Sequence, residues 1–505
     1  MLKQTSKEGA NLIMSVTVQY IIIIAMYFVA MMLIGFLFSN ASKSEKDYFL
    51  AKDKLPPSVI GFSYSATQMS GSSYLGCVGT VHSTGLPYLP VNIASAAAPW
   101  FCYVLLGDRV CRVSNRLKML SISDIFEARF GKSAGIVSSI IILIATVPVL
   151  TAQLKAAGTS FETIIGIPYL LAIFIFGAIV IIYTLAGGMF AVAWTDLVQG
   201  ILMILGFAVL LPIVVPAAGG LTNAMEAYRI NNPAFASFDG GGKPMLWVIS
   251  ALLVWGFYQI GGQPAAVTRF QTTTETKTLK KSLIYSIFFQ SFIYISVTIL
   301  GICSMALFPD LAVADQALPN LINNFLPPIV GGIVLAAALG AMMSTIDSVL
   351  LMASSVFVNN IWVKALKRKS DDKAAVKAGR IVVIVLGIVG ICVAINPPDA
   401  ILWIITMGFS IMAGAFTFPL LIGLWSKKIT QAGGFWGIIG GATTTLIWYI
   451  ISYIQHGNLN DYVWGIWPAI VGSIFSLIVM FAVSSSTPKI PEDVEEAFFA
   501  EEYVL

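Results

Sequence analysis

Long runs of apolar residues, separated by short polar stretches, fill most of this chain. A run of about 20 apolar residues is long enough for a helix to cross the hydrocarbon core of a bilayer. One range is longer than a crossing needs, so we expect that helix, 327–362, to extend beyond the bilayer. The pattern predicts about thirteen such helices, over residues 15–38, 57–82, 88–112, 133–160, 168–185, 190–216, 245–264, 281–307, 327–362, 374–396, 400–426, 433–455 and 461–484.

Polar residues and glycines interrupt two of these runs. The stretch SATQMSGSSYLG (65–76) has Ser, Thr, Gln and Gly where a spanning helix normally has Leu, Ile, Val and Phe. Lipid cannot satisfy free backbone groups, so a non-helical segment there must be buried in protein or line a wet cavity. We therefore predict an inward-facing break near Met69–Gly71. The second interruption is WGFYQIGGQP (255–264), where a Gly-Gly pair precedes a proline by two residues.

The two interrupted helices lie five predicted helices apart, so they cross the membrane in opposite directions. Matched Gly/Pro interruptions in two halves are typical of inverted repeats with a binding site near the midplane. The alternative is that the glycines only allow close helix packing. The chain then divides into a leading helix with the first loop, two repeats, two trailing helices and a tail: 1–56, 57–216, 245–426, 427–484 and 485–505.

Composition supports an all-α polytopic membrane protein. Hydrophobic residues make up 57% of the 505 and charged residues only 11%, whereas a soluble globular chain is nearer a quarter charged. The first residues contain no cleavable signal pattern, so we expect the first apolar run to remain a membrane span.

Lysine and arginine are concentrated in alternate loops, which the positive-inside rule makes cytoplasmic. The opposite loops hold little more than Arg229 and Lys243. We therefore expect a plasma-membrane protein whose amino terminus is outside and whose carboxyl terminus is inside. The acidic tail PEDVEEAFFAEEYVL should be disordered, with no further domain behind it. The basic loops contain Lys43, Lys46, Lys52, Lys54, Arg109, Arg112, Arg116, Lys118, Arg129, Lys132, Arg269, Lys277, Lys280, Lys281, Lys364, Lys367, Arg368, Lys369, Lys373, Lys377, Arg380, Lys427 and Lys428.

Polar residues also mark the predicted helix 327–362. Hydroxyls in such a helix often bond back to their own carbonyls, but a carboxylate inside a span is costly and usually marks an ion path. Together with backbone carbonyls freed by the predicted break near Met69–Gly71, the hydroxyls of this helix would form an all-oxygen shell that suits Na⁺. In GAMMSTIDSVL, helical spacing puts four residues on one face and an aspartate beside it: Ala341, Ser344, Thr345, Ser348 and Asp347.

A second acid, Asp196 in AWTDLVQG, lies in the predicted helix 190–216. It either belongs to the same ion route or caps a helix at the interface. Since either acid could carry H⁺, proton-coupled transport stays an alternative.

Other function classes find less support. The five cysteines have no metal-ligand spacing and two histidines are too few for a histidine metal site. No basic cluster with interleaved aromatics suggests nucleic-acid binding, and the acids lack a protease context, so we expect no enzymatic activity. A transporter-like channel or sensor remains a rival.

Five segments, in this order along nearly the whole chain, resemble the sodium:solute symporter family, in the branch of the sodium/proline and sodium/pantothenate permeases. They are SATQMSG, YTLAGGMFAVAWTDLVQG, GGQPAAVTRF, LAAALGAMMSTIDS and INPPDAILWI. The resemblance implies thirteen helices, a leucine-transporter-type 5+5 inverted repeat and Na⁺-coupled uptake of a small organic solute.

The resemblance also implies the Na⁺ ligands and no organic cofactor. The ligands are the backbone carbonyls of Ala66, Met69 and Ala341 and the hydroxyls of Ser344 and Thr345. In members with a second Na⁺ site, the matching positions here are Ser344, Asp347 and Ser348, and Asp196 matches an aspartate associated with sodium passage.

The chain departs from the proline-transporting members at two positions and from many relatives at a third. Gln68 stands where they have an aspartate and Ala265 where they have a histidine, while many relatives have a serine or another residue at the position of Asp347. Proline specificity therefore does not follow from the resemblance, and one or two Na⁺ per cycle both remain open.

We expect the solute to bind at the midplane beside the ion, between the two broken helices, in a chain that functions as a monomer. Lys155 is either a snorkelling interfacial lysine or a contact for a carboxylate, which favours a solute such as proline, pantothenate or another monocarboxylate. The aromatic candidates could equally serve packing. The candidate contacts are Ser70, Ser72, Ser73, Gln153, Trp255, Tyr258 and Gln259.

Overall fold

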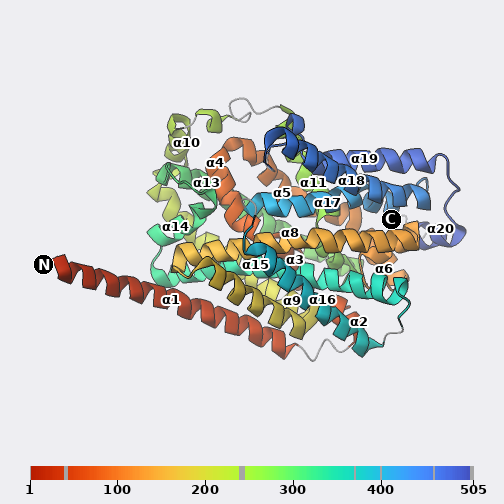
Figure 1. Cartoon of the computed structure of the whole chain (residues 1–505), viewed down its shortest axis with the longest axis horizontal. Coiled ribbons are helices and arrows are strands. Elements are labelled where there is room, and N and C mark those ends of the chain that lie inside the picture. Colours follow the sequence, from red (N-terminus) through yellow and green to blue (C-terminus); the bar gives the residue numbers. More distant parts are fainter. Residues whose placement is uncertain are drawn as a thin grey trace.

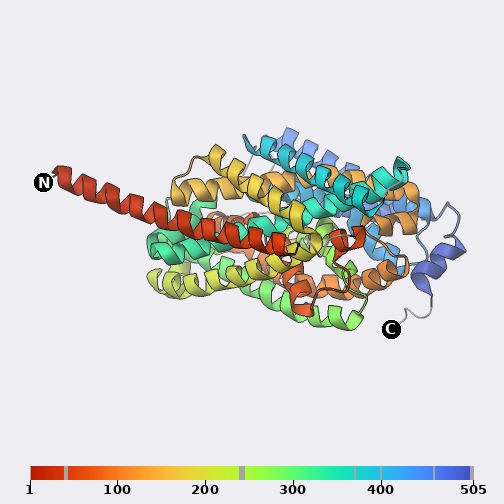
Figure 2. The same cartoon turned by 90° about the horizontal axis from the view of Figure 1, so that it is seen from below.

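The computed structural model describes residues 2–38, 44–231, 233–237, 245–368, 371–397, 401–458 and 461–500, with only the backbone described for 2–16, 234, 235 and 401–403. Within these ranges the chain forms helices and no strand. Most helices run along one axis, and the start of α1 (Leu2–Leu37) lies at the opposite end of the bundle from α20 (Glu492–Phe499) (Figures 1 and 2). Lys43, Lys243, Lys369 and residues 398–400 of INPPDAILWI lie outside the described residues.

Ten helical stretches of the described residues are long and apolar enough to cross a membrane. Their outer surfaces expose Ile, Leu, Val and Phe side chains, as expected where lipid rather than water surrounds a protein. The chain is therefore a multi-pass membrane protein. The ten are Thr17–Leu37, Leu86–Arg116, Lys132–Ile165, Tyr169–Ala217, Met245–Gly262, Thr276–Leu307, Pro328–Ala365, Asp372–Ala394, Ile404–Trp425 and Gln431–His456.

The helices of the structure overlap the predicted ranges in chain order, and the two predicted ranges 168–185 and 190–216 fall in the single element α9. The first half consists of α1, α3 (Pro57–Gln68), η2 (Ser72–Gly76), α4 (Cys77–Thr84), α5 (Leu89–Cys102), η4 (Tyr103–Gly107), α6 (Asp108–Arg116), α8 (Lys132–Ile165) and α9 (Tyr169–Ala217). The second half consists of α11 (Met245–Phe257), η6 (Tyr258–Gly262), α12 (Pro264–Val267), α13 (Thr276–Leu307), α15 (Pro328–Val356), η9 (Phe357–Ala365), α16 (Asp372–Ala394), α17 (Ile401–Trp425), α18 (Gln431–His456) and α19 (Pro468–Ser484).

Short helices connect these elements. They are α2 (Glu45–Leu50), η3 (Leu86–Tyr88), α7 (Ser123–Phe130), α10 (Gly220–Asn231), η5 (Pro233–Ala236), η7 (Thr268–Gln271), η8 (Ala314–Gln316), α14 (Ala317–Phe325) and η10 (Val463–Gly465).

Helix α9 bends at Gly188. It is 49 residues long, more than twice the length that a crossing needs, and Gly188 has φ 58° and ψ −161°. A Cβ added there would lie 2.7 Å from the Tyr48 carbonyl oxygen of α2. Only glycine adopts this conformation freely and leaves room for α2, so the chain bends at this residue. Gly188 lies between the predicted helices 168–185 and 190–216.

Gly188→Ala should therefore destabilise the protein by about 1–3 kcal/mol through backbone strain. The matched control is Gly256→Ala in α11, where an added Cβ meets no atom within 4 Å and a helical alanine stabilises by roughly 0.5–1 kcal/mol. Thermal unfolding in detergent, followed by tryptophan fluorescence, measures both variants. Equal unfolding temperatures for the two would contradict the role of Gly188.

Three glycines, which we call the glycine seam, join three long helices near the carboxyl end: Gly414 of α17, Gly441 of α18 and Gly472 of α19. An added Cβ at Gly441 would lie 1.9 Å from the Gly414 carbonyl oxygen, and one at Gly472 would lie 1.9 Å from the Thr445 hydroxyl oxygen. The three backbones are therefore in direct contact.

The prediction that the tail is disordered is wrong for residues 492–499, which form α20. Val494 and Phe498 lie one turn apart and are buried, and the Phe498 ring centroid lies 6.0 Å from Arg129 Cζ. The apolar contact outweighs the acidity of the segment because two neighbouring acids are paired: Glu495 with Lys427 (2.7 Å) and Glu496 with Arg116 (3.2 Å). Residues 501–505 lie outside the described residues.

Candidate functional site

Helix α3 ends inside the polar stretch of the first interrupted run. Met69 (φ −80°, ψ 89°) leaves the helix after Gln68, and the chain then continues as the π-helical turn η2. The Met69 N–H still donates to the carbonyls of Ser65 (2.9 Å) and Ala66 (3.1 Å). The segment is buried, so the prediction of an inward-facing break is confirmed.

Ser344 and Thr345 of α15 face this break. The Ser344 hydroxyl donates to the Ala66 carbonyl (2.9 Å) and the Thr345 hydroxyl to the Thr67 carbonyl (3.1 Å). Both are also within reach of the Ala341 carbonyl, at 3.1 and 3.2 Å, which is the back-bonding that a structural role would give. The result is a buried cluster of hydroxyl and carbonyl oxygens between α3 and α15, the donor set that a hard monovalent cation prefers.

Hydrogen bonds thus join four of the five predicted Na⁺ ligands, namely Ala66, Ala341, Ser344 and Thr345. Met69 lies at the break itself, within a turn of Ala66. The Thr67 carbonyl is an oxygen of this cluster that the sequence did not indicate.

A buried ion pair lies next to this cluster. Arg269 Nη2 of η7 is 3.2 Å from Asp196 Oδ2 of α9, and the two side chains are 1% and 0% exposed. The Ser63 hydroxyl donates to the same carboxylate oxygen and accepts from Arg269 Nε (3.0 Å). Arg269 Nη1 also donates to the Ala265 carbonyl (3.0 Å). The pair therefore ties α9 to both interrupted helices.

Asp347 extends the same network. Arg269 donates to the Ser348 hydroxyl, Ser348 lies 3.2 Å from Asp347 Oδ1, and the Tyr183 hydroxyl of α9 donates to Asp347 Oδ2. The Ser348 and Thr67 hydroxyl oxygens are 2.9 Å apart, which connects the network to the first cluster. Arg269 thus contacts Asp196 directly and is connected to Asp347 only through the Ser348 hydroxyl.

Three residues of this network, Ser63, Tyr183 and Arg269, were not among the predicted site residues. The sequence pattern groups Arg269 with the charges of a basic loop, but its side chain is buried. The signal for it was the pair of acids inside predicted spans, because buried carboxylates need a cation or several donors. Tyr183 was signalled only by its place in YTLAGGMFAVAWTDLVQG, one of the family-like segments.

Three of the solute candidates lie at the first break. The hydroxyl oxygens of Ser70 and Ser72 are 2.6 Å apart, and the Ser73 hydroxyl donates to the Gln68 carbonyl (3.3 Å). Gln153 of α8 joins them, because its Oε1 accepts from the Gly71 N–H (2.6 Å).

Gly71 also serves packing. A Cβ there would lie 2.5 Å from Ala156 Cβ of α8. Gly71 therefore has both of the roles considered from the sequence: it lies at the helix break, and it allows α8 to pack closely.

The candidates on the second interrupted helix point in different directions. The Tyr258 hydroxyl lies 2.8 Å from the Ser410 hydroxyl of α17, and Trp255 packs edge-on against the Tyr258 ring. Gln259 instead reaches the first interrupted helix, where its Oε1 accepts from the Tyr64 hydroxyl (3.4 Å). Helix packing thus accounts for Tyr258, while Gln259 lies between the two interrupted helices.

Lys155 lies apart from the break. It is only two residues from Gln153, so the two side chains leave α8 about 200° apart. Gln153 is buried against Gly71, whereas Lys155 is partly exposed.

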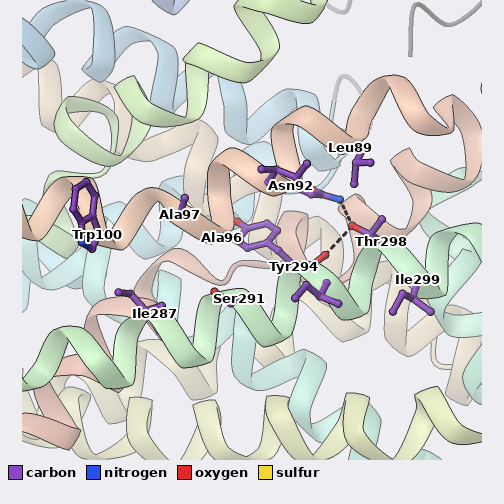
Figure 3. Close-up of a pocket in the computed structure, with 12 residues that line it drawn as sticks. Leu89, Asn92, Ala96, Ala97, Trp100, Ile287, Ser291, Tyr294, Thr298 and Ile299 are labelled. Atoms are coloured by element: carbon purple, nitrogen blue, oxygen red, sulfur yellow. Dashed lines mark hydrogen bonds between the residues drawn. The ribbon is translucent and has the colours of Figure 1, made fainter. Parts of the chain in front are cut away.

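A groove of about 580 Å³ opens between α5 and α13 (Figure 3). Its mouth exposes Ile93 and Trp100 by 57% and 50%. On its lining, the Tyr294 hydroxyl oxygen lies 3.4 Å from the Ser73 hydroxyl oxygen. The groove therefore lies behind the first break, on an apolar face, rather than between the two interrupted helices.

Comparison with known proteins gives a consistent assignment. The model of the sodium:solute symporter family matches residues 48–441. A sodium/proline symporter of Staphylococcus aureus is 30% identical over 493 residues, which cover 93% of each chain. A sodium/pantothenate symporter of Haemophilus influenzae is 28% identical over 435 residues, which cover 86% of this chain and 88% of the relative.

Solved structures share the fold. A Na⁺-coupled sialic acid symporter in a substrate-bound outward-open state has a TM-score of 0.78 at 21% identity, covering 93% of this chain and 98% of its own. Mhp1, a nucleobase-cation-symport-1 family transporter in a closed conformation, has a TM-score of 0.52 at 13% identity, covering 92% and 99%. With the family model matching well over half of its length, the chain belongs to the sodium:solute symporter family.

Proposed function

We propose that this chain uses the Na⁺ gradient to take up a small organic solute that bears a carboxylate, such as proline, pantothenate or another monocarboxylate. Family membership makes it a symporter with Na⁺ as the coupling ion. The observation that carries the proposal is the buried oxygen cluster between the break of α3 and the hydroxyls of Ser344 and Thr345. The relatives named as proline and pantothenate symporters support the carboxylate.

In this proposal Na⁺ binds the carbonyls of Ala66, Met69 and Ala341 and the hydroxyls of Ser344 and Thr345. The ion would tie the broken helix to α15 and so favour the outward-open form, because a ligand shifts an equilibrium toward the state that it binds better. The solute then completes the site and permits rocking to the inward-open state. One charge that crosses 100 mV contributes about 2.3 kcal/mol to this uptake.

We further infer thirteen crossings in the 5+5 arrangement, with repeats 57–216 and 245–426. The count of thirteen is reached by adding three crossings to the ten spans: the second half of α9, the broken helix α3–α4, and α19. The basic loops support a plasma-membrane protein with its amino terminus outside and its carboxyl terminus inside. We propose that the monomer is functional, since both interrupted helices belong to one chain.

Asp347 supports a second candidate, coupling to an additional Na⁺ or to H⁺. Among the described residues, the one cation of the buried network, Arg269, pairs with Asp196, while Asp347 is held by hydroxyl donors. With both carboxyls ionised, this cluster of two carboxylates and one guanidinium would carry a surplus negative charge, which favours binding of a further Na⁺ or of H⁺. Asp196, Asp347 and Ser348 are the residues that would provide this route.

Reconstitution in liposomes tests the proposal. Labelled proline, pantothenate, lactate, acetate and other amino acids are offered under an inward Na⁺ gradient and, separately, under an inward pH gradient. We expect Na⁺-driven accumulation of at least one carboxylate. Uptake that ignores Na⁺ and follows the pH gradient would contradict Na⁺ coupling and move attention to Asp347 and Asp196.

Lys155→Gln should change the KM for the carboxylate solute by less than about threefold, because Lys155 does not share the face of Gln153. A contact with the solute's charge would instead raise KM by tenfold or more, about 1.4 kcal/mol. Initial uptake rates at saturating Na⁺ measure this. A tenfold rise would establish Lys155 as the carboxylate contact.

A further inference from the structure

Three buried glutamines around the first break have the same arrangement: the side-chain oxygen is held and the nitrogen is unpaired. Gln153 Oε1 accepts from the Gly71 N–H, and Gln259 Oε1 accepts from the Tyr64 hydroxyl. Gln68 Oε1 accepts from the side-chain amide of Gln290. Among the described residues, the Nε2 atoms of Gln68, Gln153 and Gln259 have no hydrogen-bond partner.

These amides gather on one short segment, from Tyr64 to Gly71. Gln68 belongs to the segment, Gln259 bonds to its first residue and Gln153 to its last. At Gln153 the orientation is fixed by chemistry, because a backbone N–H can only donate and so requires the amide oxygen opposite it. The Gln153 nitrogen is therefore left as a donor, and in the structure the Gln68 and Gln259 nitrogens are left in the same way.

A fourth donor lies nearby on the second interrupted helix. Trp255 is one turn before Gln259, and its buried indole Nε1 also lacks a hydrogen-bond partner in the part of the chain that the structure describes. Buried donors are normally satisfied, so a group of them calls for an explanation. A partner for these four donors must supply acceptor atoms, although the neighbouring Gln290 Oε1 is itself an unpaired acceptor among the described residues.

We propose that these uncharged donors bind the carboxylate of the transported solute. The inference rests on the proposed function, since it names the groups that recognise the solute at that site. A carboxylate offers about four lone-pair positions and no donor, which complements amide and indole N–H groups. The buried cation near the break, Arg269, is already paired with Asp196. The protein thus reads the solute's charge through neutral donors rather than through a salt bridge.

This arrangement selects an acid over its carboxamide. The amide analogue would place its own N–H groups against unpaired donors, and sites built around specific hydrogen bonds reject such analogues strongly. In wild-type proteoliposomes, we measure uptake of the labelled acid that the panel identifies. Unlabelled competitors are added as matched acid and amide pairs: L-proline and L-prolinamide, lactate and lactamide, acetate and acetamide. We expect the transported acid to compete at least about 100-fold better than its amide.

Gln259→Glu and Gln68→Glu remove an N–H₂ group at nearly constant shape and add a like charge. We expect each to raise the KM for the acid at least about tenfold and to shrink the preference for acid over amide, since a glutamate accepts from an amide. Gln199→Glu in α9 is the matched control, because Gln199 is buried but its amide nitrogen is already close to the Tyr27 hydroxyl. Its acid-to-amide ratio should equal that of the wild type.

The outcomes separate the inference from the function on which it rests. Na⁺-driven uptake in which the amide competes as well as the acid overturns the inference and leaves symport intact. The inference is also overturned, with symport intact, if folded Gln259→Glu and Gln68→Glu proteins keep the wild-type ratio of competition by acid to competition by amide. Wild-type protein that accumulates none of the panel under a Na⁺ gradient overturns the proposed function, and the inference with it. If the variants do not fold, the wild-type ratio alone decides.

Discussion

Arg269→Met should abolish Na⁺-driven uptake and destabilise the protein by about 3–5 kcal/mol, because it leaves Asp196 as an uncompensated buried charge. Both side chains are almost completely buried, so water cannot replace the guanidinium. The same change also removes donors from Ser63 and Ser348, which join the pair to the candidate ion sites. Uptake in proteoliposomes and thermal unfolding in detergent measure the two effects.

The pair predicts a pattern among variants. Asp196→Asn should be destabilising in the same way, whereas the double variant Asp196→Asn/Arg269→Met should recover part of the stability, since it buries no unpaired charge. Arg229→Met is the matched control: Arg229 pairs with Glu226 on the surface, at 70% and 47% exposure, and its loss should be undetectable. An Arg269→Met protein as stable as the wild type would show that the buried pair contributes little.

Ser344→Ala/Thr345→Ala should greatly weaken the binding of the Na⁺ that drives uptake. Each hydroxyl bound to a charged group contributes about 1.5–3 kcal/mol, so loss of both should raise the Na⁺ concentration for half-maximal uptake by at least about 100-fold. The carbonyls of Ala66, Thr67 and Ala341 remain, so the fold should be retained. Initial rates of solute uptake across a range of Na⁺ concentrations measure the shift.

The matched control is Ser354→Ala, on the same helix α15. Ser354 is buried, and its hydroxyl has no partner among the described residues, so its removal should leave the Na⁺ response unchanged. If the double variant keeps the wild-type response, the hydroxyls only bond back to the Ala341 carbonyl. The Na⁺ would then bind elsewhere, with Asp347 the first residue to test.

The sequence predicted the features that follow from one strong physical rule. Helix positions follow from the length of apolar runs, and the break at Met69 follows from the cost of polar backbone in lipid. Ser344 and Thr345 share a face by helical periodicity, and their approach to α3 was expected from the resemblance. These predictions needed no knowledge of how other helices pack.

The features that were missed depend on packing between distant segments. Arg269 stands at the edge of a polar loop, and only the fold reveals that Asp196, 73 residues earlier, lies beside it. Phe498 sits in an acidic tail whose composition indicates disorder, yet it finds a partner in Arg129. Composition and spacing do not carry this information.

The glycine seam makes it possible to follow the movement of α17 during transport from a distant site. Helix α17 holds the partner of Tyr258, Ser410, and packs directly on α18 and α19 at the glycine seam, where the three glycine backbones meet one another and the Thr445 hydroxyl. Such close-packed contacts leave no slack, so any tilt of α17 must carry α18 and α19 with it. A fluorophore attached at the exposed Ser485, just beyond α19, would then change its emission when α17 tilts. It would report the movement of the solute site from a position that contacts neither solute nor ion.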